Sequence, residues 1–177
     1  MKIGARSGAL RTPRAHVDAM WINTAARVLP ALDRAALAPH AGPDDWVMVH
    51  DAVRPCVRRQ DIDELIAVAT SNNDGGLLAI PVSDTVKRSD ASQRALETVS
   101  RNNLWRALTP QLFKLKQLED ALKRALANGL DVTDEACAVE TTGGRPVLVP
   151  GHADNIKVTT PEDLPLAEFY LRQQGVT

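Results

Sequence analysis

The sequence carries almost no net charge and has no long apolar run. Its 21 lysines and arginines are balanced by 22 aspartates and glutamates, so no global field attracts nucleic acid or an anionic membrane. The longest apolar runs, such as residues 77–82, are far shorter than the roughly 20 residues of a membrane span. We therefore expect a soluble protein that binds neither nucleic acid nor membrane. Any anionic ligand must be bound by charged or polar groups close to its site.

Cysteine is scarce, and histidine shows no catalytic or metal-binding pattern. Cys56 and Cys137 are far apart and form no Cys-x-x-Cys or Cys/His metal motif, so a reducing cytoplasm is the expected location. The sequence contains no nucleophile motif of the Gly-x-Ser-x-Gly type. Neither metal nor triad spacing is found among the four histidines, at positions 16, 40, 50 and 152.

The first 30 residues differ from the rest in charge. They contain five basic residues and a single acid, Asp18, and they sustain no strand periodicity. Such a stretch is typical of a transit peptide or of a disordered basic tail.

From about Asp45 onward, short apolar runs alternate with helical patterns, which is typical of a mostly parallel sheet flanked by helices. The length fits one such domain. Strands are predicted over residues 46–49, 77–82, 146–149 and 155–158. Helices are predicted over residues 61–69, over 112–126 with an end at Gly129, after a cap at 133–135, and from 160 to an end at Gly175. The predicted fold is a Rossmann-like α/β domain over residues 41–177, preceded by an atypical segment over 1–40.

Residues 83–104 break this pattern because they offer little to bury. Thr85, Val86, Thr98 and Val99 flank a polar middle, as the two limbs of an extended hairpin arm would. A lone two-stranded arm is marginally stable in water, so we expect it to pack against another surface. The simplest candidate for that surface is a second copy of the chain.

An acid and an arginine follow the first predicted strand, in the stretch WVMVHDAVRP. The ligand crevice of a parallel sheet lies beyond the carboxyl ends of its strands, so Asp51 is placed to hold a divalent ion or substrate hydroxyls. Arg54 can grip a phosphate with two parallel hydrogen bonds. A plain structural interpretation stays equally open, in which Asp51 caps the next turn and pairs with Arg54.

Other polar residues have a similar double interpretation. Thr109, followed by Pro110, resembles a helix N-cap whose free backbone N–H groups can bind an anion, and Thr133 has the same pattern, although a plain cap is the commoner case. Lys157 interrupts a predicted strand, where it either reaches solvent or projects at a ligand. Thr85 and Arg101 lie on opposite limbs of the arm, where a solvated face is the simple explanation.

Five motifs, in order, resemble the 2-C-methyl-D-erythritol 4-phosphate cytidylyltransferase family of the non-mevalonate isoprenoid pathway. They are VHDAVRP, PVSDTVKR, RNNLWRALTPQLF, VTDEA and DNIKVTTPEDLPLAEFYL, and the match covers roughly residues 41–172. The resemblance implies a nucleotide-binding α/β sheet with a projecting arm, and a homodimer whose arms embrace the partner. It also implies transfer of CMP from CTP to 2-C-methyl-D-erythritol 4-phosphate with release of pyrophosphate, assisted by Mg²⁺.

The resemblance further implies roles for single residues. Asp51, Ala52 and Lys157 match positions at the CTP end of the site. Arg101 and Lys157 are similar to the catalytic residues that position the substrate phosphate for attack. The substrate pocket implied by the family matches Asp51, Arg54, Thr109, Thr133 and Lys157, with Thr85 and Arg101 reaching it from the other subunit's arm.

The beginning of the chain departs from the family pattern. The family opens with a glycine-rich loop of the type Ala-Ala-Gly-x-Gly-x-Arg, followed by a Pro-Lys pair, and residues 1–34 contain neither. We therefore expect a missing N-terminal part, through a wrong start, a frame change or a truncation, and greatly reduced turnover of the 177-residue chain. Two alternatives stay open: a cytidylyltransferase for another polyol phosphate, such as ribitol 5-phosphate, and a catalytically inactive dimerisation or binding remnant.

Overall fold

The structure is a computed structural model that describes residues 10–12, 15–21 and 41–176. The transit-peptide and basic-tail interpretations of residues 1–30 therefore fall mostly outside the described residues. Within residues 41–176, none of the helices combines the length and the apolar character that crossing a bilayer requires.

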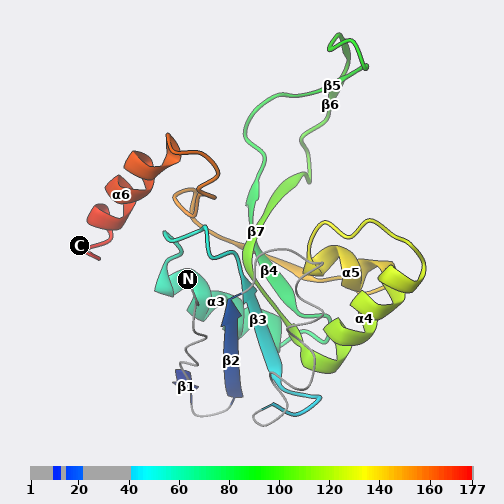
Figure 1. Cartoon of the computed structure of the whole chain (residues 1–177), viewed down its shortest axis with the longest axis vertical. Helices are drawn as coiled ribbons and strands as arrows, with labels where there is room; N and C mark the ends of the chain where they lie inside the picture. Colours follow the sequence, from blue (N-terminus) through cyan, green and yellow to red (C-terminus); the bar gives the residue numbers. More distant parts are fainter. Residues whose placement is uncertain (1–9, 13–14, 22–40, 177) are drawn as a thin grey trace.

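A six-stranded sheet forms the centre of the molecule, in the order β1-β2-β3-β7-β4-β8 (Figure 1). Strands β2, β3, β4 and β8 run in one direction, because β2 is parallel to β3, β8 is parallel to β4, and both β3 and β4 are antiparallel to β7. The predicted fold class, an α/β domain with a mostly parallel sheet, is confirmed. The strands are β1 (Leu10–Thr12), β2 (Ala15–Trp21), β3 (Trp46–His50), β4 (Gly76–Pro81), β7 (Trp105–Lys114) and β8 (Val147–Pro150).

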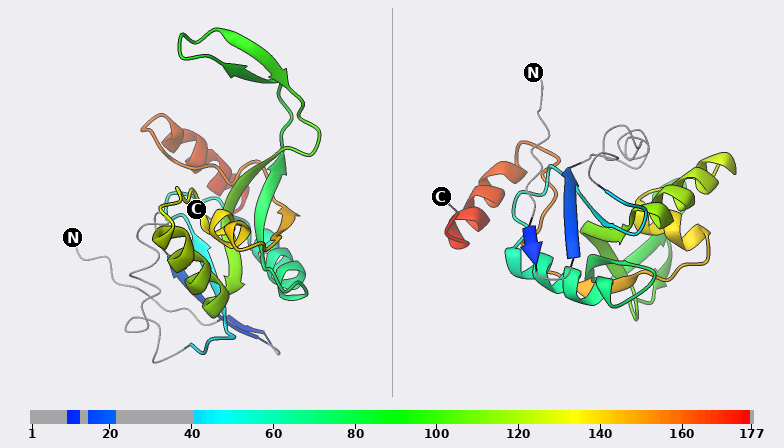
Figure 2. Two further views of the ribbon diagram at one scale, coloured as in Figure 1. Left: turned by 90° about the vertical axis from the view of Figure 1, so that its right-hand side faces the viewer. Right: turned by 90° about the horizontal axis from the view of Figure 1, so that it is seen from below.

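Helices cover both faces of this sheet (Figure 2). Side chains alternate along a strand, so Val47 and Val49 of β3 face one side and Met48 faces the other. The first side packs against α4 (Leu115–Ala127) and α5 (Glu135–Thr141), and the second packs against α3 (Arg59–Thr70). The last helix, α6 (Asp163–Gln173), buries only Ala167.

Two glycines end helices as the sequence predicts. Gly129 has φ 65° after α4, and Gly175 has φ 72° after α6, in the left-handed region that glycine adopts at low cost. The N–H of Leu130 reaches back to the carbonyl of Ala125, which completes a Schellman motif at the end of α4.

The arm predicted over residues 83–104 contains an antiparallel hairpin of β5 (Val86–Ser89) and β6 (Ala95–Val99). These two strands form a sheet of their own, and the arm extends well away from the body of the molecule (Figure 1). Nearly all of its side chains face solvent; Leu96 is 63% exposed.

The largest correction concerns the expected helix start at Thr109. Residues 109–111 lie inside strand β7, and α4 begins only at Leu115, so Leu112 of the predicted helical stripe belongs to the strand. Thr109 therefore offers no helix N-terminus to an anion. Pro110 is tolerated because the register between β4 and β7 shifts between Leu77 and Ala79, opposite this stretch, where a ladder N–H is not required.

Three smaller expectations were also wrong. Residues 155–158 form no strand, although the N–H of Val158 donates to the carbonyl of Val53 at 2.8 Å. The side chain that caps α5 is Asp134, which accepts from the N–H of Cys137, and not Thr133. Strands β1 and β2 occupy a segment without sustained strand periodicity, and β2 joins the sheet beside β3.

Candidate active site

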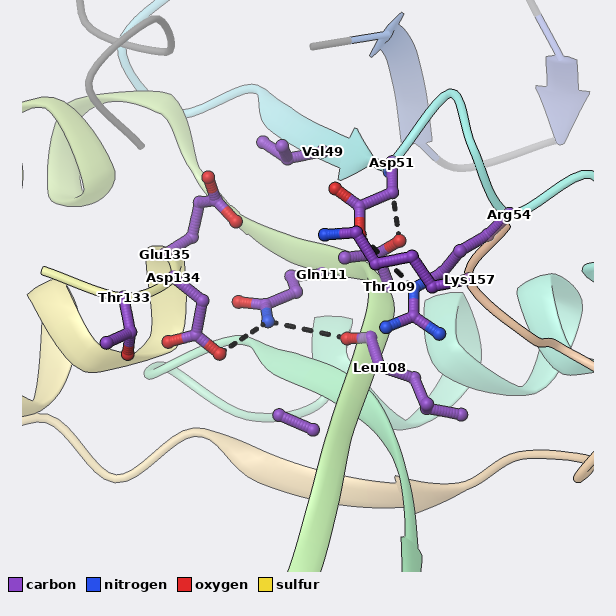
Figure 3. A pocket seen from close by; sticks show the side chains of 11 residues that line it. Val49, Asp51, Arg54, Leu108, Thr109, Gln111, Thr133, Asp134, Glu135 and Lys157 are labelled. Carbon is purple, nitrogen blue, oxygen red and sulfur yellow. Dashed lines mark hydrogen bonds and ion pairs between the residues drawn. The ribbon is translucent and has the colours of Figure 1, made fainter. Parts of the chain in front are cut away.

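A pocket of about 300 Å³ opens where β3 ends (Figure 3). Because β3, β4 and β8 are parallel, their carboxyl ends meet at one edge of the sheet, which is where open α/β sheets bind ligands. The walls of the pocket come from the loops after β3 and β8, from the middle of β7 and from the start of α5. The lining residues are Val49, Asp51, Arg54, Ala107, Leu108, Thr109, Gln111, Thr133, Asp134, Glu135 and Lys157.

One wall of the pocket holds a carboxylate between two cations. The Oδ2 atom of Asp51 lies 3.2 Å from Nε of Arg54 and 3.2 Å from Nζ of Lys157. The Arg54 Nη1 also donates to the carbonyl of Asn155 at 2.9 Å. Both cations keep further N–H donors, so this wall presents one net positive charge to an anionic ligand.

A chain of hydrogen bonds fixes the backbone below Asp51. The N–H of Asp51 donates to the hydroxyl oxygen of Thr109 at 2.9 Å, and that hydroxyl lies 2.9 Å from Nδ1 of His50. The Nε2 atom of His50 lies 3.0 Å from the carbonyl of Arg54, so the proton of a neutral ring belongs on Nε2. Burial lowers the pKa of His50, which favours this neutral form. His50 therefore helps to position Asp51 and Arg54 through these hydrogen bonds.

The opposite wall is organised by a buried glutamine. Gln111 of β7 donates from Nε2 to Asp134 at 3.0 Å, and its Oε1 accepts from the N–H of Ala136 at 2.8 Å. The side chain thus ties the start of α5 to the centre of the sheet and fixes the position of this wall.

Glu135, the first residue of α5, lines the same wall and is only 4% exposed. Burial raises the pKa of its carboxyl group to about 7, with smaller contributions of the same sign from Asp134 and Asp51. Near neutral pH this side chain is therefore divided between its neutral and charged forms.

The residues singled out from the sequence separate into two groups. Five of them, Asp51, Arg54, Thr109, Thr133 and Lys157, line the pocket together.

The other three do not line it. Ala52 is exposed next to Asp51, and Thr85 and Arg101 are exposed at the base of the arm. There Nη1 of Arg101 donates to the carbonyl of Ser83 and so links the two limbs.

Sequence reasoning gave no site role to His50, Gln111, Asp134, Glu135 or Asn155. The only available signal was position: His50 adjoins Asp51, and Glu135 lies in the VTDEA motif. Among the described residues, no group of three or more His, Cys, Asp or Glu side chains is arranged to hold a metal ion.

Comparison with known proteins agrees with this geometry. The profile of the 2-C-methyl-D-erythritol 4-phosphate cytidylyltransferase family matches residues 23–173. Enzymes of that name from Tolumonas auensis and Hahella chejuensis are 56% and 51% identical over 73% and 82% of this chain. The matches cover 57% and 60% of those relatives, so the chain spans little more than half of their length.

A solved structure gives the same result. The Francisella tularensis enzyme of this name superposes with a TM-score of 0.74 at 40% identity, over 81% of this chain and 66% of that one. The family match also extends further toward the N-terminus than the motifs indicated, since it begins at residue 23. This chain belongs to the 2-C-methyl-D-erythritol 4-phosphate cytidylyltransferase family.

Proposed function

We propose that this chain acts in the transfer of CMP from CTP to 2-C-methyl-D-erythritol 4-phosphate, with release of pyrophosphate, in isoprenoid precursor synthesis. The observation that carries the proposal is the convergence of Asp51, Arg54, Thr109, Thr133 and Lys157 on one pocket. These residues come from the loops after β3 and β8, from β7 and from the segment before α5. Each matches a substrate-pocket position that the family resemblance implies.

The reaction requires two anions to approach one another. An oxygen of the substrate phosphate attacks the α-phosphorus of CTP, a new P–O bond forms, and the bond to the β-phosphate breaks to release pyrophosphate. Lys157 and Arg54 supply positive charge, and Asp51 keeps both cations in place before the ligand arrives. The attacking phosphate is already an anion, so alignment and charge compensation provide the catalysis.

Mg²⁺ belongs to this proposal as an ion carried by the nucleotide. Mg²⁺ often binds through substrate phosphates with few protein carboxylates. The described residues do not fit a protein-held metal centre, since they offer no three-residue donor cluster and the Asp51 carboxylate already contacts two cations. The chemistry assigned here to Lys157 and Arg54 does not depend on the ion.

We also propose a cytoplasmic homodimer joined through the arms. Cys56 and Cys137 are both free thiols, which suits a reducing compartment. Among residues 41–176 the arm strands pair only with each other, and Thr85 and Arg101 are exposed at the base of the arm. In a dimer these two residues would complete the partner's pocket, with Arg101 adding to the positive charge around the substrate phosphate.

The dimer proposal predicts a large effect of a change on the arm. Leu96→Ser is expected to weaken dimerisation about 10-fold or more, because burying a leucine side chain is worth about 1.5–3 kcal/mol. Sedimentation equilibrium measures the dissociation constant. Leu126→Ser is the matched control, because Leu126 is similarly exposed at 52% but lies on α4. A chain that is monomeric at micromolar concentration, or one that tolerates Leu96→Ser, would contradict the proposal.

Calorimetry with the purified chain tests the proposed function directly. We expect 2-C-methyl-D-erythritol 4-phosphate to bind more tightly than ribitol 5-phosphate, and CTP with Mg²⁺ to bind as well. Binding of the polyol phosphate without CTP would instead favour a binding remnant. A folded chain that binds neither ligand would overturn the proposal, and pyrophosphate release in the presence of both ligands would measure turnover.

A further inference from the structure

The pocket contains a buried acid that the proposed chemistry does not use. Glu135 lies in the wall formed by the start of α5, and its side chain is nearly inaccessible to solvent in the free chain. Glutamates are almost never buried to this extent unless they are paired, because removing an ionised carboxylate from water is costly. The position of Glu135 therefore needs an explanation beyond the packing of α5.

No cation compensates the Glu135 carboxylate within residues 41–176. In this part of the chain its carboxylate accepts a hydrogen bond only from its own backbone N–H, and the charged groups that act on it are Asp134 and Asp51. Both of those side chains are negative. Arg54 and Lys157, the cations of the pocket, are held against Asp51 in the opposite wall.

The strand beside Glu135 offers no compensation either. Gln111 of β7 is neutral, and its amide is already engaged by Asp134 and by the N–H of Ala136. The ionised form of Glu135 is therefore disfavoured by burial and by the negative charges of Asp134 and Asp51, in agreement with a pKa raised to about 7.

We propose that Glu135 is a specificity residue of this pocket, which takes up a proton when a phosphorylated polyol binds and then donates that proton in a hydrogen bond to a ligand hydroxyl. The inference rests on the proposed function, because it requires such a ligand in the pocket. The proton comes from solvent, and no covalent bond of the ligand changes. A neutral carboxyl group is both donor and acceptor, which suits a polyol, whereas a carboxylate would only accept and would repel the phosphate.

The proposal fixes the direction of a pH effect. A bound dianion adds negative charge to the pocket and so favours the protonated form of Glu135. Ligand affinity should therefore be highest below about pH 7 and should fall as the pH rises through the pKa of free Glu135. If Glu135 is fully protonated in the complex, the ligand affinity should decrease about 10-fold between about pH 6 and pH 8. About half a proton should then be taken up per ligand bound at pH 7.

Two substitutions of Glu135 distinguish the effect of proton uptake from the effect of the hydrogen bond to the ligand. Glu135→Gln keeps an N–H donor but cannot titrate, so it should retain the low-pH affinity and lose the additional pH dependence. Glu135→Leu removes both functions and should bind about 10-fold more weakly than Glu135→Gln at every pH. Glu140→Gln is the matched control, because Glu140 lies on the same helix but is exposed, and it should behave like the unmodified chain.

The experiment is calorimetric titration of the full chain with 2-C-methyl-D-erythritol 4-phosphate at several pH values, in buffers of different ionisation enthalpy. The Glu135→Gln titration reports the ionisation of the ligand phosphate, and the difference from the unmodified chain isolates Glu135. Equal pH dependence and equal proton uptake in the two proteins would overturn the inference and leave the proposed function intact. Failure of the folded, unmodified chain to bind at any pH would overturn both.

A second measurement covers the case in which the variants do not fold. Carbon-13 spectra of the glutamate carboxyl groups in the unmodified chain should show one group that titrates near pH 7. Its midpoint should rise when the ligand is added. A chain in which every glutamate titrates in the ordinary acidic range would also rule the inference out.

Discussion

A chain carrying Phe113→Ala is expected to lose about 3–5 kcal/mol of its free energy of unfolding. Phe113 lies on β7 and is completely buried between the sheet and the helices α4 and α5. Its removal leaves a cavity in the central strand of the sheet, where neighbours on both sides restrict relaxation. The loss is a large part of the about 5–15 kcal/mol that stabilises an ordinary domain.

Urea denaturation with an unchanged m-value measures this effect. The second phenylalanine of the chain provides the control, because Phe169 on α6 is 53% exposed and Phe169→Ala should change stability by only about 0.5 kcal/mol. Phe113→Leu should lie in between, since it keeps most of the apolar volume. Similar losses for Phe113→Ala and Phe169→Ala would show that β7 is not central to the core.

Strand β7 is also where sequence reasoning failed, and the reason is physical. Both faces of its second half are buried, with Leu112 facing α3 and Phe113 facing α4 and α5. A strand buried on both faces shows no alternation, and its apolar residues merge with the helical stripe of α4 that follows directly. Thr109 before Pro110 then resembles a helix cap, because the register shift that accommodates the proline is a property of the pairing with β4.

For other elements of the fold, the local sequence was sufficient to predict the structure. The strands beginning at Trp46 and near Leu77 are short apolar runs bounded by polar residues, and Gly129 and Gly175 end helices by their backbone freedom. These features depend on neighbours in sequence, so a single sequence can predict them.

The pocket residues show the same difference between those that local sequence predicts and those that depend on distant segments. Asp51 and Arg54 were placed by the rule that ligands bind beyond the carboxyl ends of parallel strands, and they do line the pocket. Glu135 was interpreted only as part of a helix cap, because its burial in the pocket wall depends on segments that are distant in sequence. Thr85 and Arg101 were singled out through family motifs, and within one chain they stay outside the pocket.

Replacing Lys157 with methionine is expected to weaken binding of 2-C-methyl-D-erythritol 4-phosphate about 10- to 100-fold. A hydrogen bond to a charged group contributes about 1.5–3 kcal/mol, and methionine keeps a similar length without the charge. The folded chain itself should be little affected, because Lys157 is 42% exposed and such an ion pair contributes about 0–1 kcal/mol to stability. Asp51 keeps its contact with Arg54, so the Asp51 carboxylate is not left without a cation.

This combination of a large binding loss with unchanged stability distinguishes a ligand-binding lysine from a solvated one. Lys116→Met is the matched control, because Lys116 is also about half exposed and paired with an acid, Asp120 at 2.6 Å, but lies on α4 and does not line the pocket. Calorimetric titration of both variants, with melting temperatures measured alongside, decides between the two interpretations. If Lys157→Met binds the substrate as tightly as Lys116→Met does, Lys157 serves only to hold Asp51, and the positive charge that meets the phosphate must come from Arg54 or from the partner's arm.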